Sequence, residues 1–240
     1  SPWKGEGRLL FGVFESLRRR KESQRQKPTL LLGEILMKIL LTGFDPFGGE
    51  KINPAYEVVR RVADGMDGAE ILKLEVPTVY NVSIQQVIAR IVEVQPDVWL
   101  GIGQAGGRAD ISVERVAINI NDGRIPDNAG YQPLDEPVDA AGPSAYFATL
   151  PIKLIVEGIR TENIPASVSN SAGTFVCNHL MYGVLNFIQK RKLNMRGGFI
   201  HIPYLPVQVL DKSSSLPSMP LEMSVHAVET ALRIIARTSN

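Results

Sequence analysis

The chain alternates, from Met37 onward, between short apolar runs and segments whose apolar residues recur every three or four positions. The runs predicted as strands are residues 38–42, 70–76, 98–102, 111–118, 166–169 and 198–202. The segments predicted as helices are residues 56–62, 83–94, 153–161, 179–191 and 221–238. This alternation predicts an α/β fold with helices on both faces of one sheet, and functional groups in the loops beyond the strand ends.

Composition narrows the classes of partner. The 240 residues are 44% apolar and 21% charged, and the formal net charge is +1. This balance gives no electrostatic reason to expect nucleic acid or an anionic membrane as a partner. No apolar run is long enough to span a bilayer. The composition and net charge are most compatible with a small, uncharged substrate.

The first 36 residues differ from the rest. They carry a basic, polar run at residues 18–27, and the character changes abruptly at Met37. Runs of this kind are usually solvated or disordered rather than ligand-binding. We therefore predict that residues 1–36 are a flexible, non-catalytic appendage and that residues 37–240 form a single domain.

The chain has one cysteine, Cys177, in a turn of small residues that leads into a predicted helix. A thiol at a helix start meets unpaired backbone N–H groups and the positive end of the helix dipole, which favour the thiolate. Cys177 is therefore a candidate nucleophile. The alternative is a small buried apolar residue.

A cysteine nucleophile needs a base, and the sequence offers three histidines. His201 is best placed, because it lies near the end of an apolar strand where an imidazole requires a partner. His179 is too close to Cys177 on one helix to point the same way, and His226 lies on an amphipathic helix where a surface role is expected. Glu114, in another apolar strand, is the candidate carboxylate that orients the base, although it could instead be a salt-bridged edge glutamate.

Three glycine-rich loops are candidates for the substrate site. Residues 43–49 lack the spacing of a phosphate-binding loop, so Phe44 and Phe47 are predicted either to form pocket walls or to pack in the core. In residues 101–108, the amide of Gln104 could both donate to and accept from a lactam or peptide. Residues 122–130 could close over a site. No metal-ligand spacing appears, so metal-free acyl transfer is the simplest chemistry.

The chain resembles the pyrrolidone-carboxyl peptidase family, also called pyroglutamyl peptidase type I. The matching blocks are residues 41–50 (LTGFDPFGGE), 103–108 (GQAGGR), 114–119 (ERVAIN), 124–128 (RIPDN), 171–178 (SAGTFVCN) and 199–206 (FIHIPYLP). One position departs from the family pattern: Val207 stands where a glutamate is expected.

The resemblance implies a three-layer α/β/α sandwich around a mixed, mostly parallel twisted sheet, no cofactor, a cytoplasmic setting and a homotetramer. It assigns catalysis to Cys177, His201 and Glu114. It places the substrate pocket at Phe44, Phe47, Asn53, Thr78, Gln104, Ile125, Phe175 and Val176, with Arg124 near the nucleophile as oxyanion support.

The implied activity is that of a cysteine exopeptidase that cleaves the amide bond after an N-terminal pyroglutamyl residue through a thioester. Two alternatives remain at this stage. One is another cysteine amidase that acts on a small lactam or amide, and the other is a non-catalytic α/β ligand-binding or phosphorylase-like protein, because a fold alone does not fix a function.

Overall fold

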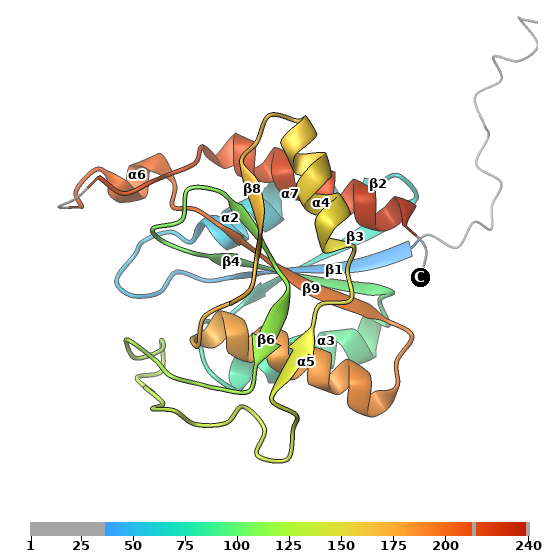
Figure 1. The fold of residues 1–240 in the computed structure, drawn as a ribbon, viewed down its shortest axis with the longest axis vertical. Coiled ribbons are helices and arrows are strands. Elements are labelled where there is room, and N and C mark those ends of the chain that lie inside the picture. The colour runs from blue at the N-terminus through green and yellow to red at the C-terminus, as the bar shows by residue number, and fades with distance from the viewer. Residues whose placement is uncertain (1–36, 213–214, 239–240) are drawn as a thin grey trace, which may run out of the picture. The chain divides into compact units, whose positions relative to one another are not determined.

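The computed structural model describes residues 37–212 and 215–238 (Figure 1). The predicted appendage, residues 1–36, lies outside these residues. Within them, no helix has the length and apolar character needed to cross a membrane.

A seven-stranded sheet forms the centre of the described part, in the order β2-β3-β1-β4-β9-β5-β8. Its strands are β1 (Met37–Phe44), β2 (Gly65–Met66), β3 (Ala69–Val76), β4 (Val98–Gln104), β5 (Ile111–Glu114), β8 (Ala166–Ser169) and β9 (Arg196–Ile202). The ladders are parallel except for the edge strand β2 and the pairing of β5 with β9. Strands β4 and β9 are buried along their whole length, as expected when helices cover both faces.

Helices cover the sheet in two layers (Figure 1). One face carries α2 (Pro54–Arg61), α4 (Ile152–Thr161) and α7 (Leu221–Arg237), and the other carries α3 (Val82–Val94) and α5 (Val176–Arg191). Each layer has its own apolar cluster against the sheet. The short helix α6 (Pro206–Val209) and a small sheet of β6 (Val116–Ile118) and β7 (Ala145–Phe147) complete the fold. The predicted α/β/α sandwich with a mostly parallel sheet is confirmed.

Two predicted boundaries are wrong in ways that matter for the site. The predicted strand 111–118 divides at Arg115, because β5 pairs in the main sheet while β6 pairs with β7. The apolar pattern runs through both strands and does not mark the change of partner. The predicted loop 101–108 begins later than expected, because β4 continues to Gln104 alongside β9.

Strands β1 and β4 stop pairing near their carboxyl ends. The pairing of β1 with β4 stops at Gly43 and Ile102, whereas β4 continues with β9 to Gln104. Because β3 and β4 lie on opposite sides of β1, this is the topological switch point, where open α/β sheets form their ligand crevices. The loops that carry Phe47 and Arg108 both start here.

Candidate active site

Cys177 is the second residue of α5, after the N-cap residue Phe175. Helix α5 begins three residues before its predicted start, so the thiol lies in the first turn, where backbone N–H groups have no partner within the helix. The sulfur lies over Gly103 of β4: a Cβ atom at this glycine would come within 2.9 Å of Sγ and 2.8 Å of the Phe199 ring. Glycine at position 103 therefore leaves the space that the nucleophile occupies.

His201 is brought to the same place by the sheet register. It is the β9 partner of Gly103 in the parallel ladder, and its ring packs against Phe199 with centroids 5.0 Å apart. Neighbouring strands lie about 4.8 Å apart, so the thiol above Gly103 and the imidazole of His201 occupy adjacent positions on one face of the sheet. The structure thus brings together the predicted nucleophile and base.

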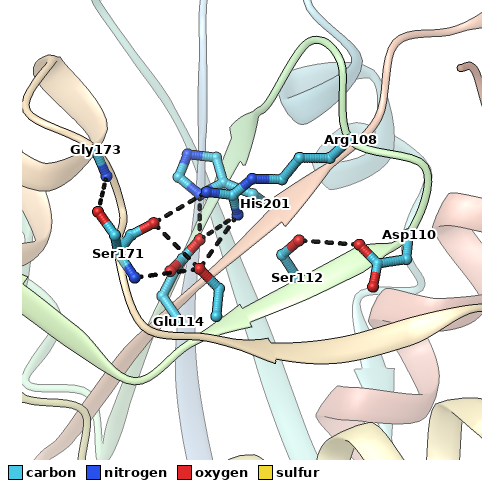
Figure 2. A network of polar contacts seen from close by, with 8 residues as sticks. Arg108, Asp110, Ser112, Glu114, Ser171, Gly173 and His201 are labelled. Carbon is cyan, nitrogen blue, oxygen red and sulfur yellow. Dashed lines mark hydrogen bonds and ion pairs between the residues drawn. The ribbon is translucent and has the colours of Figure 1, made fainter.

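Glu114 ends β5 with its side chain fully buried. Its Oε1 faces Nδ1 of His201 at 2.8 Å and accepts a hydrogen bond from Nη1 of Arg108 at 2.7 Å (Figure 2). Burial acts to raise the pKa of Glu114, but the hydrogen bond and the charge of His201, together with the hydrogen bond of Arg108, outweigh it and hold the pKa below its ordinary value. An ionised Glu114 keeps the proton on Nδ1 of His201 and leaves Nε2 available as a base.

The expected thiolate at Cys177 is not what the structure favours. Burial raises the pKa of the thiol to about 12, and the nearby charge of Glu114 adds to the rise, while Arg108 and the backbone at Cys177 oppose it. The backbone hydrogen bond and Arg108 together do not offset the loss of solvent. These surroundings favour the neutral form of the Cys177 thiol, so it would need a base to become a nucleophile.

The two predicted pocket phenylalanines differ in environment. Phe44 is only 2% exposed and lies in the core 6.4 Å from Phe199, ring centroid to ring centroid. Phe47 is half-buried, and its ring lies 5.9 Å from that of Phe175, the residue that caps the helix of the nucleophile. Phe47 and Phe175 therefore form a partly open aromatic surface next to Cys177, whereas Phe44 belongs to the core.

Asn53 and Thr78 fix the loop that carries Phe47. The side-chain amide of Asn53 donates to the carbonyl oxygen of Asp45 at 2.8 Å, and the hydroxyl of Thr78 donates to the same oxygen at 3.2 Å. The Asp45 carboxylate in turn accepts from the backbone N–H of Thr78 at 2.7 Å. Both predicted pocket residues are buried and hold the Phe47 loop in place.

The other predicted pocket residues have varied surroundings. Gln104 is largely buried, and its Oε1 accepts a hydrogen bond from Nε2 of Gln208 at 2.9 Å. Val176 is fully buried in the apolar cluster under α5, whereas Ile125 is 41% exposed. Arg124 is exposed, and no hydrogen bond or ion pair to another described residue holds its side chain.

The excursion at residues 122–130 is fastened beside the nucleophile. The backbone N–H of Asp122 donates to the carbonyl of Thr174 at 2.9 Å, and the Thr174 hydroxyl donates back to the Asp122 carbonyl at 2.8 Å. These bonds join the excursion to the turn that precedes Cys177. Its exposed Ile125 and Arg124 are therefore carried on a segment adjoining the active site.

The other histidines have structural surroundings. His179 accepts from the backbone N–H of Asn81 at 2.8 Å and contacts Oδ1 of Asn121 at 2.9 Å, and burial lowers its pKa to about 4. His226 makes a surface contact with Glu162. Among the residues that the structure describes, no three His, Cys, Asp or Glu side chains are grouped so that they could hold a metal ion.

Two residues without a predicted role, Arg108 and Gln208, contact predicted site residues. Arg108 donates a hydrogen bond to Glu114, and Gln208 donates one to Gln104. Arg108 had a usable signal, because a cation directly after two glycines and shortly before a buried glutamate suggests a turn that returns the cation to the carboxylate. Gln208 had none, since it lies 104 residues from its partner.

Comparison with known proteins identifies the family of the chain. The sequence model of the family described as "Pyroglutamyl peptidase" matches residues 37–238. The chain is 64% identical over 202 residues to pyrrolidone-carboxylate peptidase 2 of Caldanaerobacter subterraneus subsp. tengcongensis, which covers 84% of this chain and 98% of the relative. It is likewise 64% identical over 203 residues to the pyrrolidone-carboxylate peptidase of Thermoanaerobacter sp. strain X514, covering 85% of this chain and all of the relative.

Solved structures show the same likeness. The crystal structure of pyroglutamyl peptidase I from Bacillus amyloliquefaciens superposes with a TM-score of 0.81 at 49% identity, covering 84% of this chain and 98% of that one. The pyrrolidone carboxyl peptidase from Thermococcus litoralis gives a TM-score of 0.80 at 37% identity, covering 83% and 93%. Because the family match spans all of the described residues, the chain belongs to the pyroglutamyl peptidase family of cysteine-type hydrolases.

Proposed function

We propose that this chain hydrolyses the amide bond after an N-terminal pyroglutamyl residue of peptides, with Cys177 as nucleophile, His201 as base and Glu114 as the carboxylate that orients the base. The observation that carries the assignment is the hydrogen bond of 2.8 Å between Nδ1 of His201 and the buried Glu114, on the strand next to the glycine beneath the thiol. Family membership supports the substrate class.

In the first step, Nε2 of His201 takes the proton of Cys177 as Sγ bonds to the pyroglutamyl carbonyl carbon. The π electrons of that carbonyl move onto its oxygen. Backbone N–H groups in the first turn of α5 face the developing negative charge, and Arg124 on the adjoining excursion adds a cation. Because the resting thiol is neutral, proton removal and bond formation are coupled.

In the second step, the imidazolium gives its proton to the leaving amine nitrogen, the C–N bond breaks, and a thioester to Cys177 remains. Water then attacks the thioester while His201 accepts a proton from it, which releases pyroglutamate and restores the thiol. Glu114 stays ionised throughout and supports the positive charge on the imidazole.

Specificity follows from the chemistry of the substrate's end. A pyroglutamyl residue has no charged α-amine, because the amine is closed into a lactam. Its ring suits the half-buried aromatic surface of Phe47 and Phe175, whereas an ordinary N-terminus would bring an ammonium group there without a partner. The polar edge of the lactam would be bound by Gln104. Also by family likeness, we propose a homotetramer in the cytoplasm that needs no cofactor.

The decisive experiment compares wild type with Cys177→Ser on a chromogenic pyroglutamyl anilide. Turnover should fall on the order of 10⁴-fold or more, because the serine hydroxyl is far less acidic than a thiol, while the melting temperature stays near that of wild type. Substantial turnover by the variant would contradict the mechanism. Anilides of leucine and of small carboxylic acids serve as controls, and equal turnover of these by wild type would point to a general amidase.

A further inference from the structure

Arg108 joins the buried carboxylate of the site to the segment that leads to the nucleophile. Its Nη1 donates to Oε1 of Glu114 at 2.7 Å, and its Nη2 donates to the carbonyl oxygen of Ser171 at 2.9 Å (Figure 2). A weaker contact of 3.4 Å links Nη1 to the hydroxyl of Ser169, the strand partner of Glu114. A planar guanidinium can make these contacts together, whereas an ammonium cannot span them.

The loop before Arg108 is built to direct its side chain. The backbone N–H of Arg108 closes a turn onto the carbonyl of Ala105 at 3.2 Å. A side chain at Gly106 would overlap the Tyr204 ring, at 2.2 Å, and Gly107 has a φ of +91°, a conformation that favours glycine. The two glycines therefore fix the direction of Arg108 through the backbone, as expected for a residue with a defined task.

Arg108 and His201 bind the same atom. Both contact Oε1 of Glu114, and Oε2 is buried with no hydrogen-bond partner among the described residues. One carboxylate oxygen thus serves two donors that compete for its charge. Against burial, the hydrogen bond and the charge of His201 lower the pKa of Glu114 most, and the hydrogen bond from Arg108 adds to them. The guanidinium also places a positive charge near the imidazole.

We propose that Arg108 is a positioning residue of the catalytic site, which shares Glu114 with His201, ties that carboxylate to the turn before Cys177 and sets the pH range in which the site works. This rests on the proposed function, since it assigns Arg108 a role toward the same three residues. Arg108 does not contact the reacting atoms. It acts through Glu114 and through its charge.

The charged groups around Cys177 and His201 determine in which direction the pH profile should move when Arg108 is replaced. Glu114 on β5 faces His201, Arg108 on the preceding loop faces Glu114, and Cys177 on α5 feels both, with Glu114 raising its pKa and Arg108 lowering it. Removing the guanidinium charge therefore favours the protonated thiol of Cys177. A thiol that holds its proton more tightly reacts only at higher pH, so the acidic limb of the rate profile moves to higher pH.

The test uses three variants. Arg108→Met and Arg108→Gln remove the positive charge, and Arg108→Lys keeps the charge but lacks the planar guanidinium that can contact Glu114 and Ser171 together. In the neutral variants the acidic limb of kcat/KM should move up by about 0.5 to 1 pH unit, a shift reduced by solvent because the Arg108 side chain is 32% exposed. Arg108→Lys should leave the limb in place and lower the rate about 3- to 30-fold, because the bond to Ser171 is lost.

Arg90→Met is the matched control. Arg90 lies on α3, pairs with Glu93 at 2.7 Å and has the same side-chain exposure of 32%, but it contacts none of the three catalytic residues. Its profile should coincide with that of wild type. If a folded neutral variant of Arg108 keeps the wild-type limb, or if Arg108→Lys keeps the full wild-type rate, the proposal is overturned.

The pH dependence of Cys177 alkylation by iodoacetamide provides a readout without substrate. The neutral variants should alkylate along a curve displaced to higher pH, in the same direction as the rate profile. This readout distinguishes failure of the proposed function from failure of the role proposed for Arg108. If the enzyme is inactive on pyroglutamyl anilides but the alkylation curve of the neutral variants is displaced, only the proposed function is refuted. An active enzyme with an unmoved curve refutes the role of Arg108 alone.

Discussion

His201 and His179 are both buried, yet their surroundings give them opposite properties. His179 uses both ring nitrogens: Nε2 accepts from the backbone N–H of Asn81, so Nδ1 carries the proton that faces Asn121. His201 faces a carboxylate with Nδ1, and no hydrogen bond from its Nε2 to another described residue is formed. Burial alone therefore does not distinguish a candidate base from a structural histidine.

The charge of the partner distinguishes the two sites. Neutral partners leave His179 without compensation for burial, so its pKa falls to about 4 and it stays uncharged over the range in which most enzymes work. A carboxylate such as Glu114 can support an imidazolium during a reaction. The region of His201 is therefore suited to proton transfer, and the region of His179 to holding α5 against the loops of Asn81 and Asn121.

Within this comparison of the two histidine regions, the largest effect is expected from replacing the proposed base. His201→Gln should lower kcat about 10³- to 10⁴-fold with a small change in KM, because the proton acceptor for Cys177 is lost while the pocket remains. Steady-state kinetics on a pyroglutamyl anilide measures both values. A variant that retains a tenth or more of wild-type kcat would remove the distinction between the two histidines.

A smaller loss is expected from neutralising the carboxylate. Glu114→Gln should lower kcat about 10- to 10³-fold, because the amide still accepts a hydrogen bond but no longer supports the imidazolium. Full activity would instead assign Glu114 to the ion pair with Arg108 alone.

The same variant has a signature in stability. The pKa of Glu114 is lowered in the folded state, so its ionised form adds stability above the ordinary glutamate range, and this contribution is lost as the pH falls below about 4.3. The melting temperature of Glu114→Gln should therefore depend less steeply on pH in that acidic window. Melting curves between about pH 3 and 5 measure the difference from wild type.

Phe47→Ala tests the pocket beside this machinery. Loss of the half-buried ring should raise KM for pyroglutamyl substrates about 10-fold, a cost within the range for exposing one aromatic side chain, and leave alkylation of Cys177 nearly unchanged. Phe44 is a poor probe, since it lies in the core and its truncation would cost about 3–5 kcal/mol of stability. An unchanged KM would place the substrate ring elsewhere.

The sequence predicted the layers of the fold because strand and helix periodicities differ, and it singled out His201 and Glu114 because polar residues are rare in apolar strands. It could not show that the chain leaves the main sheet after β5, at Arg115, because the apolar pattern continues into β6. It also predicted a thiolate at Cys177 from the helix start alone. The burial that opposes this preference arises where the sulfur packs over Gly103, which is distant in sequence.

The smallest effect on activity is expected at the other histidine. His179→Gln should keep kcat within about 3-fold of wild type, because His179 donates nothing to the reaction, but it should lower the free energy of unfolding by about 1–3 kcal/mol through its lost hydrogen bonds. The pH dependence gives a sharper test. In the unfolded chain an imidazole takes up a proton near pH 6.5, whereas folded His179 does so near pH 4, so falling pH favours unfolding between these values.

The size of this effect follows from the separation of the two pKa values, which corresponds to as much as about 3 kcal/mol of wild-type stability lost on acidification. His179→Gln should abolish that slope between about pH 6.5 and 4, while Glu114→Gln changes the slope only at lower pH. Thermal melting of both variants and wild type across this range separates the two windows. If His179→Gln melted with the wild-type pH dependence, His179 would not be held uncharged by its surroundings, and the contrast with His201 would have to rest on the carboxylate alone.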